Sequence, residues 1–279
     1  EAGPAAMWFQ RGAEREQVKK RLGETLDRLA RTGVLPTLPH AASAALAMIR
    51  TTDPDVGKLA AVIRTDIGLT ACVLRLANSV VYARRAPATT VQAAILTVGM
   101  RKTCDIIVAA SARRLCGAAG EYAEVLWSHA LAVGIAAEEL AKVRGAGDPE
   151  SVFLPGLLHD VGRIAFFLAD PVAFGEVERA CLRRRRDRTA LETKRYGCDH
   201  TEVGSALAGE WGLAPAHCEA IRWHHQARPD EPTHRLAVLI NAADAVAHGI
   251  EETDDAHVAA DAEVQALGLS AGDQAAWIG

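Results

Sequence analysis

Residues 152–168 read VFLPGLLHDVGRIAFFL and form the most apolar stretch of the chain. His159, Asp160 and Arg163 interrupt it before it reaches the roughly 18 to 20 apolar residues of a membrane span, so the stretch predicts a buried core helix. Burying an unpaired carboxylate such as that of Asp160 costs several kcal/mol, and a compensating charge must therefore lie close to it. A divalent cation bound by the imidazole and the carboxylate would supply that charge directly.

Helical patterns continue on both sides of this stretch. Aromatic residues make up only 5% of the 279 residues, alanine and leucine are frequent, and no period-two alternation is long enough to indicate a sheet. The predicted fold class is therefore all-α, a compact multi-helix bundle. Apolar spacing, caps and breakers predict helices at 14–31, 41–50, 91–98, 101–115, 121–143, 150–167, 172–196, 200–211, 214–224 and 235–248, with two shorter ones that follow Asp53-Pro54-Asp55 and Asp66.

Breaker residues divide the chain into four predicted parts. We expect a helix within residues 1–34, and, since the chain opens at Glu1 without a methionine, we expect the first residues to be foreign or the cut end of a longer protein. Gly117-Ala118-Ala119-Gly120 is the first internal boundary, so we expect an N-terminal helical part at 35–120 and a helical bundle at 121–250. Residues 251–279 form a tail or a last helix.

Composition and charge argue against several classes of protein. Hydrophobic residues make up 49% and charged residues 24%, and a net charge of −4 gives no support to general nucleic-acid binding. The six cysteines include no C-x-x-C pair, so we expect neither a disulfide framework nor a zinc knuckle. Since we also expect no signal peptide and no membrane insertion, the cytoplasm is the expected location, and the oligomeric state stays open.

Histidines and aspartates of the second half supply the candidate chemistry. A lone histidine on an apolar helix is usually a hydrogen-bonded core residue. His159-Asp160 and His224-His225 do not fit this description, because each is an adjacent pair of possible metal ligands. Adjacent imidazoles on a helix diverge by about 100°, so each can serve a different ligand position. The predicted metal ligands are His129, His159, Asp160, His200, His224, His225 and Asp244.

This set of donors predicts divalent transition metals. Mixed imidazole and carboxylate ligands suit iron or manganese, and then zinc, nickel or cobalt, better than magnesium or calcium. The candidates exceed the shell of one tetrahedral zinc and suit two ions that share a bridging carboxylate. Such a pair activates water and holds a phosphoryl oxygen, which is the chemistry of phosphoester hydrolysis.

The order of these residues resembles the metal-binding signature of the HD superfamily of metal-dependent phosphohydrolases. From about Leu35 onward the chain resembles more specifically an HDOD domain, the HD-related output domain of bacterial signal-transduction proteins. The motifs behind this resemblance are Leu38-Pro39, Asp53-Pro54, Leu74-Arg75-Leu76-Ala77-Asn78-Ser79, Trp127-Ser128-His129, the segment 156–163, the segment 199–204, Trp211-Gly212-Leu213 and the segment 220–225.

The resemblance implies an all-α fold in which an N-terminal helical part packs on an HD-like bundle. It also implies a regulatory role that acts through contacts with signalling proteins, and a retained HD-type metal site, since all seven ligands match by position. The alternative is an active metal-dependent phosphohydrolase or phosphodiesterase that acts on a nucleotide or cyclic dinucleotide. In that case Asp160 would be catalytic, together with Arg163, which would bind a phosphate.

Two departures from the HD-GYP enzymes, which cleave cyclic di-GMP, weaken that particular assignment. No Gly-Tyr-Pro follows His225, and Arg163 stands where those enzymes have a lysine. A nucleotide receptor without cleavage is a third hypothesis, for which Arg163 and the run RRRRDR at 183–188 are the candidate contacts. The simpler interpretation of this run is a solvated helix face.

Overall fold

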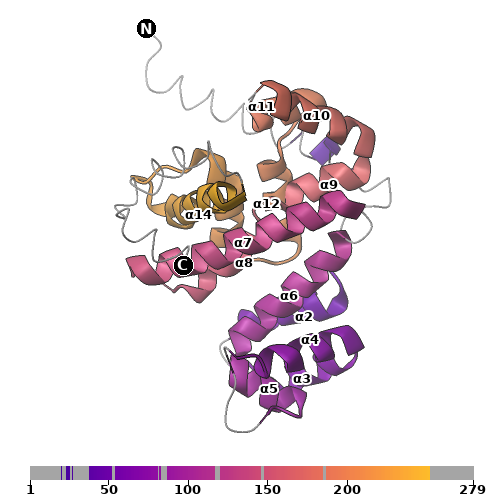
Figure 1. The fold of residues 1–279 in the computed structure, drawn as a ribbon, viewed down its shortest axis with the longest axis vertical. Helices are drawn as coiled ribbons and strands as arrows, with labels where there is room; N and C mark the ends of the chain where they lie inside the picture. The colour runs from indigo at the N-terminus through magenta and orange to yellow at the C-terminus, as the bar shows by residue number, and fades with distance from the viewer. Residues whose placement is uncertain are drawn as a thin grey trace. The chain divides into compact units, whose positions relative to one another are not determined.

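The computed structural model describes residues 20, 23–25, 27, 38–51, 54–80, 82, 87–116, 120–145, 148–184 and 187–251. Within these ranges the chain forms helices and no strand, which confirms the predicted all-α class (Figure 1). Packing divides the chain into two compact units. Unit 1 contains Asp160–Leu207 with Thr25 from the N-terminal part, and unit 2 contains Thr37–His159 and the chain from Ala208 onward. The division predicted at residue 120 stays a prediction.

Unit 2 holds most of the helices. In chain order these are α2 (His40–Ile49), α3 (Val56–Arg64), α4 (Ile67–Ala77), α5 (Val91–Val98), α6 (Met100–Cys116), α7 (Gly120–Arg144), α8 (Glu150–Leu158), α13 (Pro215–Trp223), the 3₁₀ turns η2 (His224–Gln226) and η3 (Pro232–His234), and α14 (Arg235–Glu251). Unit 1 contains α9 (Val161–Ala169), α10 (Pro171–Arg184), α11 (Arg188–Tyr196) and the larger part of α12 (His200–Glu210). The predicted segments 1–34 and 251–279 lie almost entirely outside the described residues.

Local capping explains where several helices begin. Asp55 accepts hydrogen bonds from the backbone N–H groups of Gly57 and Lys58, and Asp66 accepts one from Leu69 N–H at 3.0 Å. These contacts satisfy backbone donors that have no partner inside the helix. Both predicted caps are therefore confirmed. A fork from Arg114 also binds the Asp66 carboxylate and, with the Leu69 N–H, lowers the pKa of Asp66 to about 2.

Asn78, at the end of α4, makes a two-way hydrogen bond with the backbone of Ala88. Its amide nitrogen donates to Ala88 O at 3.0 Å, and its carbonyl oxygen accepts from Ala88 N–H at 2.7 Å. Asn78, part of the motif 74–79, thus has a structural role as a hydrogen-bonding residue. The contact fixes the chain as it returns toward α5.

The two apolar cores of unit 2 use different residues. Aliphatic side chains such as Leu59, Ile63 and Ile107, each 0% exposed, fill the core around α2–α6, and each stabilises the fold by about 1.5–3 kcal/mol. The second core joins α7, α8, α13 and α14, and alanines dominate it. Such small side chains let helix backbones approach closely, which positions the polar residues described below.

Two predicted helices are wrong because each is two helices. The segment 150–167 breaks between α8 and α9, where Asp160 leaves the helical conformation with φ −101° and ψ 13°. The segment 172–196 breaks before Asp187, whose carboxylate accepts from Thr189 N–H at 3.0 Å and begins α11. His159 and Asp160 therefore lie at helix ends rather than inside one helix. These ends leave both side chains free to turn toward polar partners.

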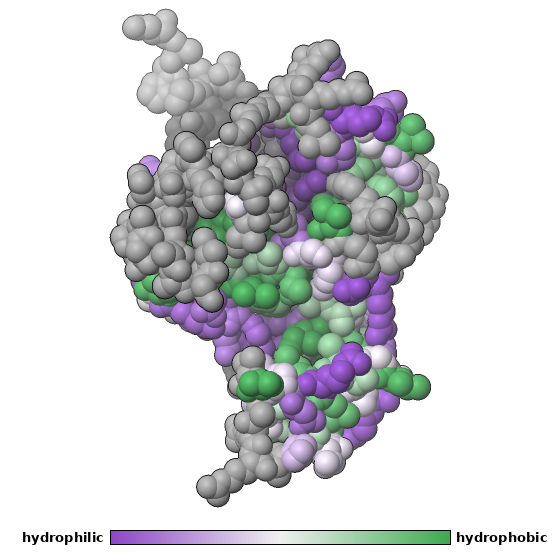
Figure 2. Space-filling view, in the orientation of Figure 1, coloured by the Kyte–Doolittle hydropathy of each residue, from purple (hydrophilic) through white to green (hydrophobic). Residues whose placement is uncertain are grey.

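Among the described residues, the segment Glu150–Ala169, which comprises α8 and α9, is long and apolar enough to cross a membrane by length and composition. The prediction that no stretch reaches this length is thus wrong, although 78% of its most apolar window is buried in the protein, as in the core helix of a soluble domain. Large apolar side chains also reach the surface singly, for example Ile67 and Val80. On the face of the molecule that Figure 2 shows, hydrophobic and hydrophilic residues are interspersed among the described residues, which is ordinary for a folded protein.

Candidate metal centre

A buried cluster of His129, His159 and Asp244 lies in unit 2. Their side chains come from α7, the end of α8 and α14, and the three residues are 4%, 1% and 9% exposed. His129 Nε2 lies 2.9 Å and His159 Nε2 lies 3.7 Å from Asp244 Oδ1. One donor atom from each residue lies within 4.8 Å of the others, so a single cation could contact all three.

A contact between two glycines brings α7 and α8 close enough to form this cluster. A Cβ atom on Gly156 would lie 3.1 Å from Gly134 Cα, and a Cβ atom on Gly134 would lie 3.1 Å from Phe153 O. A side chain at either position would make contacts tighter than usual with these backbone atoms and would push the helices apart by a few tenths of an ångström. The sequence therefore sets the helix separation that places His129 beside His159.

Backbone carbonyls orient two of the imidazoles. His159 Nδ1 donates to Gly156 O at 2.8 Å, and His224 Nδ1 donates to Ile221 O at 2.8 Å. When a neutral imidazole donates through Nδ1, its Nε2 bears the lone pair that binds a metal. This arrangement of the outer hydrogen bond is the usual one for a metal-binding histidine.

His224 and His225 extend the cluster within unit 2, but they do not continue a helix as predicted. Helix α13 ends at Trp223, and the pair opens the 3₁₀ turn η2. The His224 ring is fully buried, with its centroid 5.0 Å from that of His159, and the exposed His225 ring lies with its centroid 4.0 Å from that of His224, tilted by 46°. The two rings thus lie close together, although successive residues diverge by about 100° on an α-helix and by about 120° in a 3₁₀ turn.

His248, one turn after Asp244, is a neighbour of the cluster. Its Nδ1 lies 3.0 Å from Asp244 Oδ1, and its side chain is 49% exposed. Burial would raise the pKa of Asp244, but the hydrogen bonds from His129 and His248 hold that pKa well below its ordinary value. The carboxylate is therefore charged, as a metal ligand must be.

In unit 1, Asp160 and His200 are brought together on α9 and α12. His200 is 0% exposed, and its Nε2 lies 3.3 Å from Asp160 Oδ1. On the other side of the ring, Glu192 accepts hydrogen bonds from His200 Nδ1 at 2.6 Å and from His200 N–H at 2.9 Å. Burial disfavours the charged imidazole, yet Glu192 and Asp160 raise the pKa of His200 above its ordinary value.

Arg163 pairs with carboxylates of its own unit. Its Nη1 donates to Asp160 Oδ2 at 2.5 Å, and its Nη2 lies 3.4 Å from Glu178 Oε2. Arg188, the last residue of the basic run, also pairs with Glu178, whereas the side chains of 183–186 lie outside the described residues. A phosphate at Arg163 would therefore compete with two carboxylates for the same guanidinium.

The predicted ligands thus group by unit, and sequence reasoning missed some of their partners. Unit 2 assembles His129, His159 and Asp244 with the His224-His225 pair, and unit 1 assembles Asp160 with His200. Glu192 and Glu178 were missed because a glutamate in a charged helical segment resembles a solvated residue. Only the Asp187 cap before α11 was a usable local signal, since it separates that helix from α10.

The unit 2 donors fit a divalent transition metal. The imidazoles of His129 and His159, the latter with a preset Nε2 lone pair, and the charged Asp244 carboxylate form a mixed nitrogen and oxygen set, which iron, manganese or zinc accept more readily than magnesium or calcium. The residues are candidate ligands, and their chemistry agrees with that of a metal site.

The sequence matches the family profile of the HDOD domain over residues 35–227. The chain belongs to the HDOD family. This match covers the α2–α6 helices and most of the polar residues described above, and it confirms the predicted resemblance.

Relatives of this HDOD chain agree with the assignment. An uncharacterized protein of Treponema pallidum (strain Nichols) is 27% identical over 194 residues, which are 68% of this chain and 37% of that protein. The chain therefore spans little more than a third of the length of the curated relative it matches.

Two solved structures show the same fold. An HDOD domain protein of unknown function from Geobacter sulfurreducens is 27% identical, with a TM-score of 0.69 over 81% of this chain and 77% of that one. A protein of Shewanella amazonensis SB2B, provisionally named a phosphohydrolase, is also 27% identical, with a TM-score of 0.69 over 82% of each chain.

Proposed function

We propose that this HDOD chain is a regulatory domain of bacterial signal transduction, which acts in the cytoplasm through contacts with signalling proteins and binds a divalent transition metal. Family membership supports the signalling role. The observation that supports the metal is the cluster of His129, His159 and Asp244, whose donor atoms lie within 4.8 Å of one another in a buried site. When bound, the cation would neutralise the Asp244 carboxylate and could polarise a water molecule or phosphoryl oxygen.

Burial of the cluster favours a regulatory or structural role for the metal. All three side chains are nearly inaccessible, whereas catalytic metal sites keep an open position for water or substrate. A second ion is part of the proposal because seven candidate ligands exceed the shell of one ion. We favour iron or manganese over zinc, nickel or cobalt, given the carboxylates in the set.

Protein purified without chelators is expected to contain iron or manganese, measured by plasma mass spectrometry, and Asp244→Ala is expected to lose most of it. The substitution removes the carboxylate that lies between His129 Nε2 and His159 Nε2. Chelation of the wild type should also lower its Tm, because a metal that binds only the folded chain stabilises it.

The matched control is His40→Ala, which removes an exposed imidazole far from the cluster in sequence. Its metal content should equal that of the wild type. Equal metal content in Asp244→Ala, or a wild type that takes up no metal on reconstitution, would contradict the metal part of the proposal and leave the signalling part to be tested by partner binding.

Phosphoester hydrolysis is the second candidate function. The observation in its favour is the pair of Asp160 and His200, with Glu192 behind the imidazole, because a carboxylate and an oriented histidine can bind a cation that activates water. We expect that the metal-loaded chain hydrolyses bis(p-nitrophenyl) phosphate and cyclic dinucleotides no faster than Asp160→Asn does. Wild-type turnover well above that variant would replace the regulatory proposal by the enzymatic one.

A further inference from the structure

A second polar site lies in unit 2, in a cavity of about 160 Å³ that shares no residue with the metal cluster. Its walls come from α2, α6, α8, the connection at 212–214 and the start of α13. An engineered cavity of about 150 Å³ in another protein binds benzene, so this volume suits a ligand with one small ring or a short chain. We propose that this cavity binds a small organic cation of the amine or amidine class through the carboxylate of Asp105.

Asp105 is the residue that requires a ligand. It is 2% exposed, and its Oδ2 has no hydrogen-bond partner among the described residues. The neighbouring cations are engaged elsewhere, because Lys102 pairs with Glu138 and Arg101 Nη1 lies 3.1 Å from Asp148 Oδ2. A buried carboxylate without a donor is unfavourable, and a bound N–H group would remove that cost.

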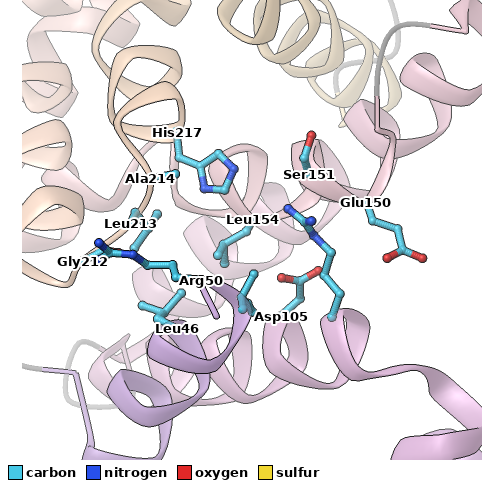
Figure 3. A pocket seen from close by; sticks show the side chains of 12 residues that line it. Leu46, Arg50, Asp105, Glu150, Ser151, Leu154, Gly212, Leu213, Ala214 and His217 are labelled. Carbon is cyan, nitrogen blue, oxygen red and sulfur yellow. The ribbon is translucent and has the colours of Figure 1, made fainter. Parts of the chain in front are cut away.

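The walls of the cavity complement such a ligand. Leu46, Leu154 and Leu213 are 5%, 2% and 6% exposed and supply an apolar surface for the body of the molecule. Figure 3 shows the Asp105 carboxylate and the His217 imidazole directed toward the same space from α6 and α13. Burial, and to a lesser degree Arg101, lower the pKa of His217, so this ring is uncharged and can accept a second hydrogen bond.

The charges at the cavity favour a cation over an anion. Arg50 donates to Gly212 O at 3.1 Å and is exposed, and Arg101 is bound to Asp148, so both lining guanidinium groups already have an acceptor. The buried acceptor is Asp105, and Glu150 adds a further carboxylate at the exposed side. A ligand that donates N–H groups therefore gains more in this cavity than a ligand that accepts them.

Benzamidine tests the proposal, since it combines a small ring with a planar cationic donor, and benzoate is its anionic counterpart of equal shape. Calorimetric titration of the full chain at pH 8 should show saturable benzamidine binding in the millimolar range or tighter, and benzoate binding at least tenfold weaker. Asp105→Asn keeps the volume but removes the charge, and should weaken benzamidine binding by at least tenfold. The exposed Asp230→Asn is the matched control and should bind like the wild type.

The pH dependence provides a second measurement that does not rely on a variant. Burial raises the pKa of Asp105 to about 7, against the attraction of Lys102 and Arg101. Because the cation binds the ionised carboxylate, affinity should rise roughly tenfold from pH 6 to pH 8 in the wild type. His217→Gln should keep this rise, which would exclude His217 as its source. The other charged or titratable groups around Asp105 are Arg50, Arg101, Lys102, Cys104, Glu138 and Glu150.

Three results would overturn the proposal: no saturable benzamidine binding at either pH, benzoate binding as tight as benzamidine binding, or unchanged affinity in Asp105→Asn whose circular dichroism matches the wild type. Asparagine at this buried position removes a charge without removing volume, so the variant should fold. None of these results bears on metal content, so the proposed function is tested separately.

Discussion

Replacing Gly162 with alanine is expected to destabilise the chain by more than about 3 kcal/mol and to lower its Tm by roughly 6–12 °C. A Cβ atom at this position would lie 2.0 Å from His200 O and 2.9 Å from Gly204 N. Both obstacles are backbone atoms of α12, so no side-chain rotation can relieve the clash. Helix α9 would have to move away from α12, which would also separate Asp160 from His200.

The control for this substitution is Gly175→Ala on α10 in the same unit. The nearest atoms to a Cβ there belong to the flexible guanidinium group of Arg179, at 3.5 Å or more. Because alanine favours a helix over glycine, this variant should gain up to about 1 kcal/mol. Thermal denaturation of the two variants side by side measures the difference. If Gly162→Ala were as stable as Gly175→Ala, the close approach of the α9 and α12 backbones at Gly162 would be refuted.

Glu192→Ala should cost about 3–5 kcal/mol of unfolding free energy, measured by urea denaturation. The Glu192 carboxylate is 1% exposed and accepts from both the backbone N–H and Nδ1 of His200. Its removal leaves a fully buried imidazole without its main acceptor, and loosens the ring that faces Asp160. Glu192→Gln keeps an acceptor for both donors but loses the charge, so its cost should be clearly smaller.

Glu176→Ala is the control, because Glu176 lies exposed on α10. Its free energy of unfolding should stay within about 0.5 kcal/mol of the wild type. A wild-type free energy of unfolding for Glu192→Ala would mean that the buried hydrogen bonds to His200 add nothing, and the role of Glu192 in positioning this histidine would be refuted.

Local signals predicted the parts of the fold that local chemistry determines. Asp55 and Asp66 begin helices because a carboxylate satisfies free backbone N–H groups within three residues, and that pattern is visible in the sequence. The helix at Val91–Val98 has the predicted bounds, since Gly99 with φ +94° ends it. The family motifs then predicted which histidines and aspartates would gather.

Contacts between distant residues could not be predicted in the same way. The break at His159 and Asp160 has no proline and no side-chain capping hydrogen bond, and partners such as Asp244 and His200 engage the two side chains instead. Glu192 lies in a helix rich in charged residues, where a buried carboxylate leaves no local signal.

Asp105 and His217 show the same limit at the cavity. His217 belongs to none of the histidine and aspartate motifs of the sequence, and Asp105 lies in a mixed helical segment that resembles a solvated one. Only the packing of α6, α8 and α13 gives these two residues a common space. Burial, rather than residue type, thus decides which titratable groups are candidates for a functional role.

The order of the two units along the chain has a consequence for synthesis on the ribosome. Residues Asp160–Leu207 of unit 1 are contiguous and lie as an insertion within unit 2, whose α13 and α14 come after it. Contacts within the insertion close over short chain lengths, whereas α7 and α8 must wait for α14 across the whole insertion. A nascent chain that ends at residue 207 would therefore expose the alanine-rich face of α7 and Val152 of α8, and would depend on the last helices to protect it from aggregation.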